Sequence, residues 1–333
     1  MIKKIFDKLY NFHSLNQKES YYIFNLILKN KLTLAQITAI LISMKLKVES
    51  IDEIIGAIQA CQENILFFPR PKYLFADITG TGGDYMNTIN ISTLSALLAS
   101  SFGLKIVKHC NTGVSSSIGS ADILKKLNIA INLHPKDARN MLEKNNICFL
   151  FAPHYHSAFK YVSEIRKQLN TRTIFNILGP LINPAEPSLS VIGVYSKDLL
   201  LPVAHILNLL NVQRAMIIHS DGTDEVTLHS VTHVLEINQE RIHSYKLHPE
   251  DFGVRKVPKK FFMYNTIQKK YQIFEDICKG NSSVEYYNLI AVNTALILKL
   301  FGYEDLKENT KIVFEKIRRG ELIKHIQNIS NKS

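Results

Sequence analysis

A glycine-rich run, Asp77-Ile-Thr-Gly-Thr-Gly-Gly-Asp84, constrains the fold more than any other feature of this chain. It directly follows the apolar segment Tyr73–Ala76 and precedes a helix-like segment that starts near Asn87. In α/β proteins, a strand, a glycine turn and a helix start in this order form a seat for a phosphate, because glycine backbones and helix N-termini both present N–H donors to an anion. The spacing matches neither the P-loop nor the dinucleotide fingerprint. The run alone therefore predicts an anion site without naming the ligand.

Short apolar runs alternate with helix-like segments from Tyr73 onward, which predicts an α/β domain over residues 73–333. Strand–helix alternation favours right-handed crossovers and a mainly parallel sheet flanked by helices. A polar-edged hairpin is expected over Thr232–His248, and helices are expected over Val284–Phe301 and Asp305–Ile326. The expected strands of the sheet are residues 73–78, 105–108, 147–152, 189–195 and 214–219.

The N-terminal residues 1–70 predict a small helical domain. Thr33-Leu-Ala-Gln36 and Ser50-Ile-Asp-Glu53 have the form of capping boxes, and each precedes an amphipathic stretch. Pro69 and Pro71 mark the end of this region. The fold class is therefore a small helical domain followed by a larger α/β domain.

Charge and cysteine usage limit the classes of function. The net charge of +11 fits either a nucleic-acid binder or an enzyme with polyanionic substrates, but the basic residues are scattered and carry no RNA-binding signature. The four cysteines are far apart, as in proteins of a reducing cytoplasm. Met1–Asp7 lacks a signal-peptide core, and the apolar Ala291–Leu300 is short enough to be a buried helix. We expect a cytoplasmic protein with neither nucleic-acid nor membrane partners.

Three further segments carry polar chemistry. Lys108–Asp122 contains one Lys, one His, one Asn and four Ser, so it has many donors and little to bury. A second segment extends from Arg166 to Pro184. Its last part, Arg172–Pro184, reads Arg-Thr-Ile-Phe-Asn-Ile-Leu-Gly-Pro-Leu-Ile-Asn-Pro. The third, Asp221-Gly-Thr-Asp-Glu225, is an acidic turn after an apolar run. Adjacent carboxylates on such a turn are able to share a hard cation.

These segments, in this order, resemble the anthranilate phosphoribosyltransferase family. The motifs of that family correspond in this chain to Gly80–Asp84, Asn90-Ile-Ser-Thr93, Lys108–Asp122, Arg172–Pro184 and Asp221–Glu225. The resemblance spans nearly the whole chain. The resemblance implies a fold like that of nucleoside phosphorylases and phosphoribosyltransferases, with the chain returning to the helical domain near residues 171–187. It also implies a homodimer that associates through the N-terminal helices.

The resemblance implies transfer of a phosphoribosyl group from 5-phosphoribosyl 1-diphosphate to anthranilate, with release of diphosphate, in tryptophan biosynthesis. No catalytic acid or base is implied, because gripping a diphosphate leaving group and holding an amine in line suffice for an oxocarbenium-like reaction. The implied residues for 5-phosphoribosyl 1-diphosphate are Gly80, Gly83, Asp84, Thr88, Asn90, Ile91, Ser92, Thr93, Lys108, Ser115, Ser116 and Ser120. Those for anthranilate are Gly80, His109, Asn111, His156 and Arg166.

Two Mg²⁺ sites are also implied, one with Ser92 and a second with Asp224 and Glu225. Each assignment has a structural alternative: a plain turn for the glycine run, helix capping for Asn90 to Thr93, a solvated loop for the Ser-rich segment and an acidic surface turn for the carboxylates. Two other functions stay open. One is a pyrimidine nucleoside phosphorylase of the same architecture, and the other is a non-catalytic basic binding protein.

The sequence departs from the family pattern in the Ser-rich segment. Cys110 stands where the family usually has Gly, Thr112 where it usually has Arg, and Ser117 where a Lys is often found. A Cβ at position 110 would cost energy if the site needs a positive φ. The Arg and Lys that Thr112 and Ser117 replace would have placed two positive charges beside the phosphates. We therefore expect weaker binding of 5-phosphoribosyl 1-diphosphate than in relatives, with anthranilate less affected because Asn111 is retained.

Overall fold

The computed structural model describes residues 1–82, 89–113, 119–239, 241–263 and 266–330. Contacts within it divide the chain into two compact units. The first unit comprises Met1–Phe67 and Ala152–Pro184, and the second comprises Phe68–Phe151 and Ala185–Ser333. The chain therefore leaves the first unit, builds part of the second, and returns.

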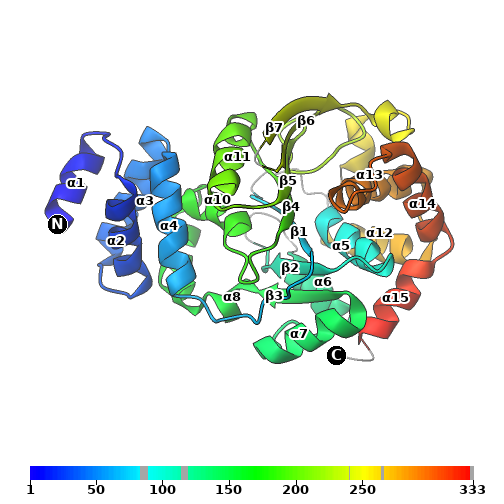
Figure 1. Cartoon of the computed structure of the whole chain (residues 1–333), viewed down its shortest axis with the longest axis horizontal. Coiled ribbons are helices and arrows are strands. Elements are labelled where there is room, and N and C mark those ends of the chain that lie inside the picture. Colours follow the sequence, from blue (N-terminus) through cyan, green and yellow to red (C-terminus); the bar gives the residue numbers. More distant parts are fainter. Residues whose placement is uncertain (83–88, 114–118, 240, 264–265, 331–333) are drawn as a thin grey trace. The chain divides into compact units, whose positions relative to one another are not determined.

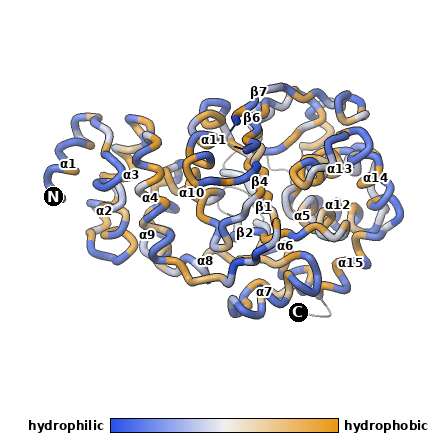
Figure 2. Tube along the Cα trace, in the orientation of Figure 1, coloured by the Kyte–Doolittle hydropathy of each residue, from blue (hydrophilic) through white to orange (hydrophobic). Residues whose placement is uncertain are grey.

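The first unit is helical throughout its regular structure (Figure 1). Blue and orange alternate along its N-terminal helices in Figure 2, the pattern of amphipathic segments. Its elements are α1 (Ile2–Tyr10), α2 (Gln17–Leu28), α3 (Leu34–Lys47), α4 (Ile51–Glu63), α8 (Ala152–Tyr155), η1 (Ser157–Phe159), α9 (Lys160–Leu169), α10 (Ile174–Leu178) and η2 (Gly179–Leu181).

Side-chain caps start α3 and α4, which confirms the capping boxes predicted from the sequence. Thr33 Oγ1 accepts from Gln36 N at 3.3 Å, and Ser50 Oγ accepts from Glu53 N at 3.3 Å. Glu53 is fully buried, and its carboxylate also accepts from Leu15 N at 2.9 Å and from Lys47 Nζ at 2.5 Å. A buried carboxylate is tolerated here because hydrogen bonds and a cation satisfy it.

The second unit is built on a seven-stranded sheet with the order β3-β2-β1-β4-β5-β6-β7. The first five strands in that order are parallel, whereas β6 and β7 pair antiparallel as the predicted hairpin. The strands are β1 (Ala76–Gly80), β2 (Ile106–Cys110), β3 (Ile147–Phe151), β4 (Leu189–Gly193), β5 (Arg214–His219), β6 (Thr232–Asn238) and β7 (Arg241–Leu247).

Helices cover both faces of this sheet, which confirms the predicted α/β class. In Figure 1, α5 and α13 lie on one side and α11 on the other. Residues of α13 are almost all buried, as expected for a short apolar segment. The helices are α5 (Ile91–Ser101), α6 (Ser120–Lys126), α7 (Pro135–Asn145), α11 (Leu200–Leu209), α12 (Ile267–Lys279), α13 (Val284–Leu300), α14 (Leu306–Arg318) and α15 (Glu321–Ser330), with short 3₁₀ turns η3 (Lys197–Leu199), η4 (Pro249–Phe252) and η5 (Lys259–Phe262).

Strand order reverses between β1 and β4. From β1 the chain proceeds to β2 and β3 on one side, and from β4 it proceeds to β5 on the other. The two strands end side by side, with Gly80 in register with Gly193. Ligands of open α/β sheets bind outside the carboxyl ends of the strands at such a reversal. The glycine-rich run begins within β1, whose last residue is Gly80, and continues past the end of the strand, so the topology and the sequence indicate the same edge of the sheet.

Two parts of the secondary structure differ from the sequence expectation. The expected single helix over 305–326 is two helices, α14 and α15, and Gly320 between them has a φ of +64°. Helices α7 and α12 were not predicted at all. No described helix is both long and apolar enough to cross a bilayer.

Candidate active site

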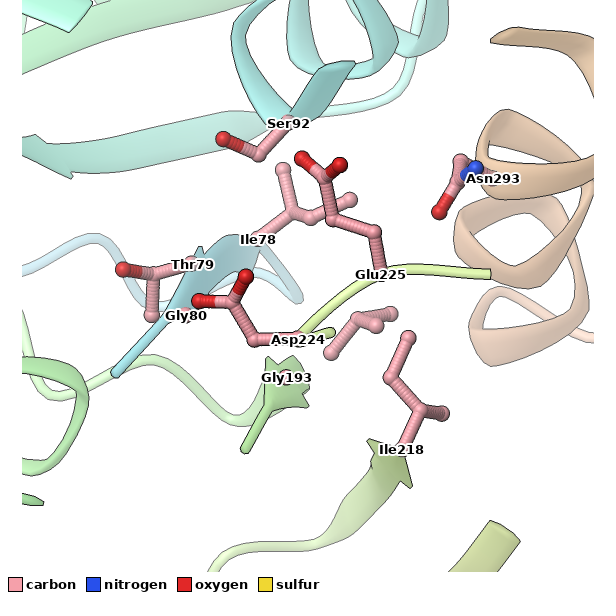
Figure 3. Close-up of a pocket in the computed structure, with 10 residues that line it drawn as sticks. Ile78, Thr79, Gly80, Ser92, Gly193, Ile218, Asp224, Glu225 and Asn293 are labelled. Atoms are coloured by element: carbon pink, nitrogen blue, oxygen red, sulfur yellow. The ribbon is translucent and has the colours of Figure 1, made fainter. Parts of the chain in front are cut away.

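A small pocket lies at the carboxyl ends of β1 and β4 (Figure 3). Its volume is about 40 Å³, more than the roughly 10–15 Å³ that one water molecule needs. Its polar lining comes from Thr79, Ser92, Asp224, Glu225 and Asn293. The pocket therefore joins the glycine turn, the start of α5, the acidic turn after β5 and the middle of α13, which are distant in the sequence.

Asp224 is held against the glycine-rich run. Its Oδ2 accepts a hydrogen bond from Gly82 N at 2.7 Å. A Cβ added at Gly80 would lie 2.2 Å from the same oxygen, so this position must be glycine for the carboxylate to sit here. In Figure 3 the Asp224 carboxylate points toward Gly80. The acidic turn and the glycine turn, predicted as separate motifs, thus form one structure.

Glu225 extends from the same turn toward Ser92, at the start of α5 (Figure 3). Both side chains line the pocket, and Glu225 is half-buried. Two carboxylates and a hydroxyl facing one cavity supply the oxygen ligands that Mg²⁺ prefers. The structure therefore brings together the three residues that the resemblance assigns to metal binding.

Lys108 lies inside β2 with only 2% of its surface exposed. Its Nζ donates to the carbonyl of Ile78 at 2.5 Å and to Ser92 Oγ at 3.3 Å. Burial lowers the pKa of this ammonium, while the neighbouring Asp77 carboxylate raises it. The charge of Lys108 therefore lies beneath the pocket, where it contacts Ser92 directly.

The starts of α5 and α6 are joined by a hydrogen bond. Thr93 Oγ1, which is fully buried, donates to Ser120 Oγ at 2.9 Å. Asn90 is the N-cap of α5, and Ile91 is buried in its first turn. The Asn90 side chain makes no cap hydrogen bond to α5, so side-chain capping does not account for this residue, and the binding role of Asn90 to Thr93 stays a prediction.

His109 and Asn111 lie on β2 and just after it. His109 is buried, with 9% of its surface exposed, whereas Asn111 is exposed and its Oδ1 accepts from Thr112 N at 2.8 Å. Neither residue lines the pocket of Asp224 and Glu225. Their predicted contact with anthranilate stays a prediction.

His156 and Arg166 belong to the first unit. His156 is buried and stacks on Phe159 with a centroid distance of 4.9 Å. The Arg166 guanidinium lies 5.5 Å from the centre of the Phe175 ring, and no carboxylate in the described part of the chain shifts its pKa. Burial lowers its pKa from the usual arginine value. A half-buried cation over an aromatic ring is a suitable partner for a planar carboxylate.

The strain expected at Cys110 if its site needed a positive φ does not arise. Cys110 is the last residue of β2, pairs with Phe151 and does not have a positive φ. It is 4% exposed, and burial raises its pKa to about 12, so it behaves as a small apolar residue of the sheet. The cation missing at Thr112 remains the reason to expect weaker diphosphate binding.

Several predicted residues of the diphosphate site lie outside the described residues. They are Gly83, Asp84, Thr88, Ser115 and Ser116.

The described residues fit a Mg²⁺ ion that is shared with a substrate. Within the described ranges, no group of three or more His, Cys, Asp or Glu side chains is arranged to hold a metal. Mg²⁺ commonly uses one or two carboxylates and completes its six ligands with water and substrate phosphates. Asp224, Glu225 and Ser92 match that ligand set.

Gly193 and Asn293 are among the pocket residues that were not identified from the sequence. A Cβ on Gly193 would lie 1.6 Å from the carbonyl oxygen of Asp224, so Gly193 makes room for the acidic turn. Asn293 is 3% exposed and hydrogen-bonds the backbone of Val226. The sequence signal for Asn293 was a lone amide within the apolar run of α13, which indicates a buried hydrogen-bonding role.

Family models match most of the chain. The helical bundle domain of a glycosyl transferase family matches residues 2–65, and the a/b domain of that family matches residues 72–323. The two matches leave a short gap that contains Pro69 and Pro71.

Relatives and solved structures agree with these models. An anthranilate phosphoribosyltransferase of Buchnera aphidicola subsp. Acyrthosiphon pisum (strain Tuc7) is 52% identical over 330 residues, covering 99% of this chain and 96% of the relative. The crystal structure of the Thermus thermophilus enzyme has a TM-score of 0.90 at 28% identity, covering 98% of both chains. The Saccharomyces cerevisiae enzyme in complex with PRPP and Mg has a TM-score of 0.90 at 26% identity, covering 99% of this chain and 97% of that one. With a full-length relative this similar, the chain belongs to the anthranilate phosphoribosyltransferase family.

Proposed function

We propose that this protein transfers the phosphoribosyl group of 5-phosphoribosyl 1-diphosphate to anthranilate, giving N-(5-phosphoribosyl)anthranilate and diphosphate, a step of tryptophan biosynthesis. The observation that carries this proposal is the 52% identity to an anthranilate phosphoribosyltransferase over 99% of the chain. Solved relatives from Saccharomyces cerevisiae hold PRPP and Mg in one case and 4-fluoroanthranilate in another. The pocket at the β1–β4 reversal supports the same function, because it combines the start of α5 with oxygen ligands.

The diphosphate is bound where β1 ends. Gly82 N donates to the carboxylate of Asp224, which ties the glycine turn to the acidic turn, and the start of α5 at Asn90 to Thr93 places the positive end of a helix dipole at the same pocket. Bound Mg²⁺ supplies charge neutralisation that makes diphosphate a better leaving group. Ser92 would hold one ion and Asp224 with Glu225 a second, and Lys108 orients the Ser92 hydroxyl. We infer two Mg²⁺ sites, and the presence of Mg in the yeast complex supports the use of this ion.

Arg166 binds the carboxylate of anthranilate in this proposal. Its support is the uncompensated guanidinium over the Phe175 ring, described above. Because anthranilate carries its own amine nucleophile, this chain needs to position that amine in line and exclude water rather than supply a general base. Gly80, His109, Asn111 and His156 are the other residues proposed for anthranilate.

We also infer a domain division, an assembly and a location. The division into a helical domain of residues 1–70 with a returning segment and an α/β domain within residues 73–333 is supported by the two compact units, although the returning segment of the first unit is 152–184 rather than 171–187. A homodimer through the N-terminal helices is supported by apolar side chains exposed there, including Leu34 and Leu46. A cytoplasmic location is supported by four cysteines that are buried and not in disulfides.

The loss of anthranilate fluorescence in the presence of 5-phosphoribosyl 1-diphosphate and Mg²⁺ tests the proposed function. We expect anthranilate to be consumed only when the protein, 5-phosphoribosyl 1-diphosphate and Mg²⁺ are all present. Excess chelator should stop the reaction. A parallel reaction with thymidine and inorganic phosphate tests the pyrimidine nucleoside phosphorylase alternative. Consumption of thymidine without consumption of anthranilate would overturn the proposal, and full activity in chelator would overturn the role of Mg²⁺.

A further inference from the structure

Asn293 is a buried amide in the mainly apolar second half of α13. It lies in the middle of α13, is 3% exposed, and lines the same pocket as Asp224 and Glu225. In Figure 3 its side chain points from α13 toward the chain segment that carries Glu225. A buried amide costs stability unless its donors and acceptor are paired, so its partners reveal what it does.

The partners of Asn293 are mainly on the residue after Glu225. Asn293 Oδ1 accepts from Val226 N at 3.0 Å, and Asn293 Nδ2 donates to Val226 O at 2.9 Å. Nδ2 also donates to Leu289 O, one turn earlier in α13, at 2.8 Å. The side-chain amide thus hydrogen-bonds both the N–H and the C=O of Val226, as the backbone of a neighbouring strand would. The two residues are 67 positions apart in the sequence.

The acidic turn is therefore fixed at both ends. At its start, Ser220 and Thr223 exchange backbone hydrogen bonds of 3.2 and 2.9 Å. At its end, Val226 is 1% exposed and held by Asn293. Asp224 and Glu225 lie between these two anchors. Because a carboxylate ligand must keep its position within about 0.5 Å to bind a metal well, the rigidity of this turn matters for the cation.

We propose that Asn293 is a positioning residue that fixes the Glu225 carboxylate relative to Ser92 and so sets the affinity of the pocket for a divalent cation with diphosphate. The proposal deepens the proposed function and rests on it for the identity of the metal. Asn293 contacts Val226 rather than the ion, so it acts through the backbone. Removing such a supporting partner typically weakens metal affinity or activity about 10–100-fold.

Thr294, the next residue of α13, offers a matched control. It is fully buried, and its Oγ1 donates to Ile290 O at 2.8 Å within the helix. The Thr294→Val substitution removes a buried hydrogen bond of the same helix while leaving the acidic turn untouched. Asn293→Ala and Thr294→Val should therefore both lower the Tm, whereas Asn293→Ala alone should change cation binding.

The test measures binding of Mn²⁺, detected by electron paramagnetic resonance, in the presence of inorganic pyrophosphate and without anthranilate. We expect Asn293→Ala to raise the half-saturating Mn²⁺ concentration about tenfold or more, and Thr294→Val to leave it unchanged. In the activity assay, Asn293→Ala should raise the half-saturating Mg²⁺ concentration while the KM for anthranilate stays the same. A loss of Tm without any change in Mn²⁺ binding would reduce Asn293 to a core hydrogen bond and overturn the proposal.

Asn293→Ser keeps the test decisive if Asn293→Ala does not fold. A serine hydroxyl is able to hydrogen-bond a carbonyl of the preceding helical turn, as Asn293 does with Leu289, but is too short to pair with both groups of Val226. We expect the same weakening of Mn²⁺ binding with a smaller loss of Tm. Mn²⁺ binding does not depend on anthranilate. A wild-type protein that binds Mn²⁺ with pyrophosphate but leaves anthranilate unchanged would therefore overturn the proposed acceptor and leave the role of Asn293 intact.

Discussion

Two glycines determine where the carboxylate of Asp224 can lie. A Cβ added at Gly80 would lie 2.2 Å from Asp224 Oδ2, and one added at Gly193 would lie 1.6 Å from Asp224 O. Both distances are far below any ordinary contact. Neither glycine has a positive φ, so the constraint is close approach rather than backbone conformation. Glycine is needed at both positions because the acidic turn lies directly against the ends of two parallel strands.

At the residue scale, we predict that Arg166→Ala raises the KM for anthranilate far more than the KM for 5-phosphoribosyl 1-diphosphate. A lost charged hydrogen bond costs roughly 1.5–3 kcal/mol, which corresponds to about a ten- to hundredfold change. Steady-state kinetics with each substrate varied in turn measures the two KM values. Arg166→Lys is the control, since it keeps the charge but loses the planar fork, and it should fall between wild type and alanine.

An equal rise in both KM values, together with a lower Tm, would assign Arg166 to the packing of α9 on the Phe175 ring instead. Circular dichroism and thermal unfolding of the same two variants separate these outcomes.

At the element scale, α15 contacts α5 through a histidine that is held neutral. His325 Nε2 lies 2.8 Å from Ser100 Oγ, and burial, assisted by the nearby Lys316, lowers the pKa of His325 to about 4. The unfolded chain takes up this proton near pH 6.5, so between pH 6.5 and 4 it binds more protons than the folded protein. The stabilisation is therefore complete above pH 6.5 and is lost as the pH falls toward 4.

We predict that His325→Gln removes part of this acid sensitivity. For the pKa shift to about 4, the full effect corresponds to roughly 3 kcal/mol. Tm measured from pH 7.5 to 4 should fall less steeply in His325→Gln than in wild type. His13→Gln, which alters an exposed histidine, serves as the control and should keep the wild-type slope. Identical slopes for all three proteins would show that His325 titrates normally.

Many of the helices and strands were predictable because the residues that start or form them are neighbours in the sequence. The capping residues Thr33 and Ser50 marked helix starts correctly, and the alternation of apolar runs gave the parallel sheet. Helix α12 was not predicted because it is amphipathic but not strongly apolar. Its start is marked by the N-cap Thr266, which is a weak signal in the sequence. The break between α14 and α15 depends on Gly320, whose positive φ is clear only in the structure.

The candidate site was predictable where its residues carry unusual sequence runs. Gly80, Ser92, Asp224 and Glu225 were each part of a recognisable segment, and the structure brings these four to one pocket. Asn293 was not predictable as a site residue, because its importance comes from Val226, 67 residues away. Local sequence does not reveal which turn a buried amide will meet.

At the scale of the whole molecule, we predict a homodimer formed through the N-terminal helices. Leu34 and Leu46 of α3 are 66% and 64% exposed, and exposed apolar side chains of this size favour association. Light scattering at micromolar concentration should give twice the chain mass of 38.0 kDa. Leu34→Glu should weaken the dimer, whereas Leu201→Glu, at a position of α11 that is 53% exposed, should not.

A monomeric mass for the wild-type protein at that concentration would contradict the dimer. Dissociation by Leu201→Glu rather than Leu34→Glu would place the contact elsewhere on the molecule.

The discontinuity of the first unit also has a consequence for how the protein is made on the ribosome. Residues 1–67 emerge early, but partners that complete their packing, such as Phe175 against Phe24 and Tyr155 O against Leu66 N, lie within 152–184. At about 5–20 residues per second, synthesis of the intervening segment and the returning one takes on the order of ten seconds. During that time the nascent helices expose apolar faces to chaperones. The N-terminal unit is therefore completed only after β1, β2 and β3 of the second unit have been synthesised, but before β4 to β7 have been made.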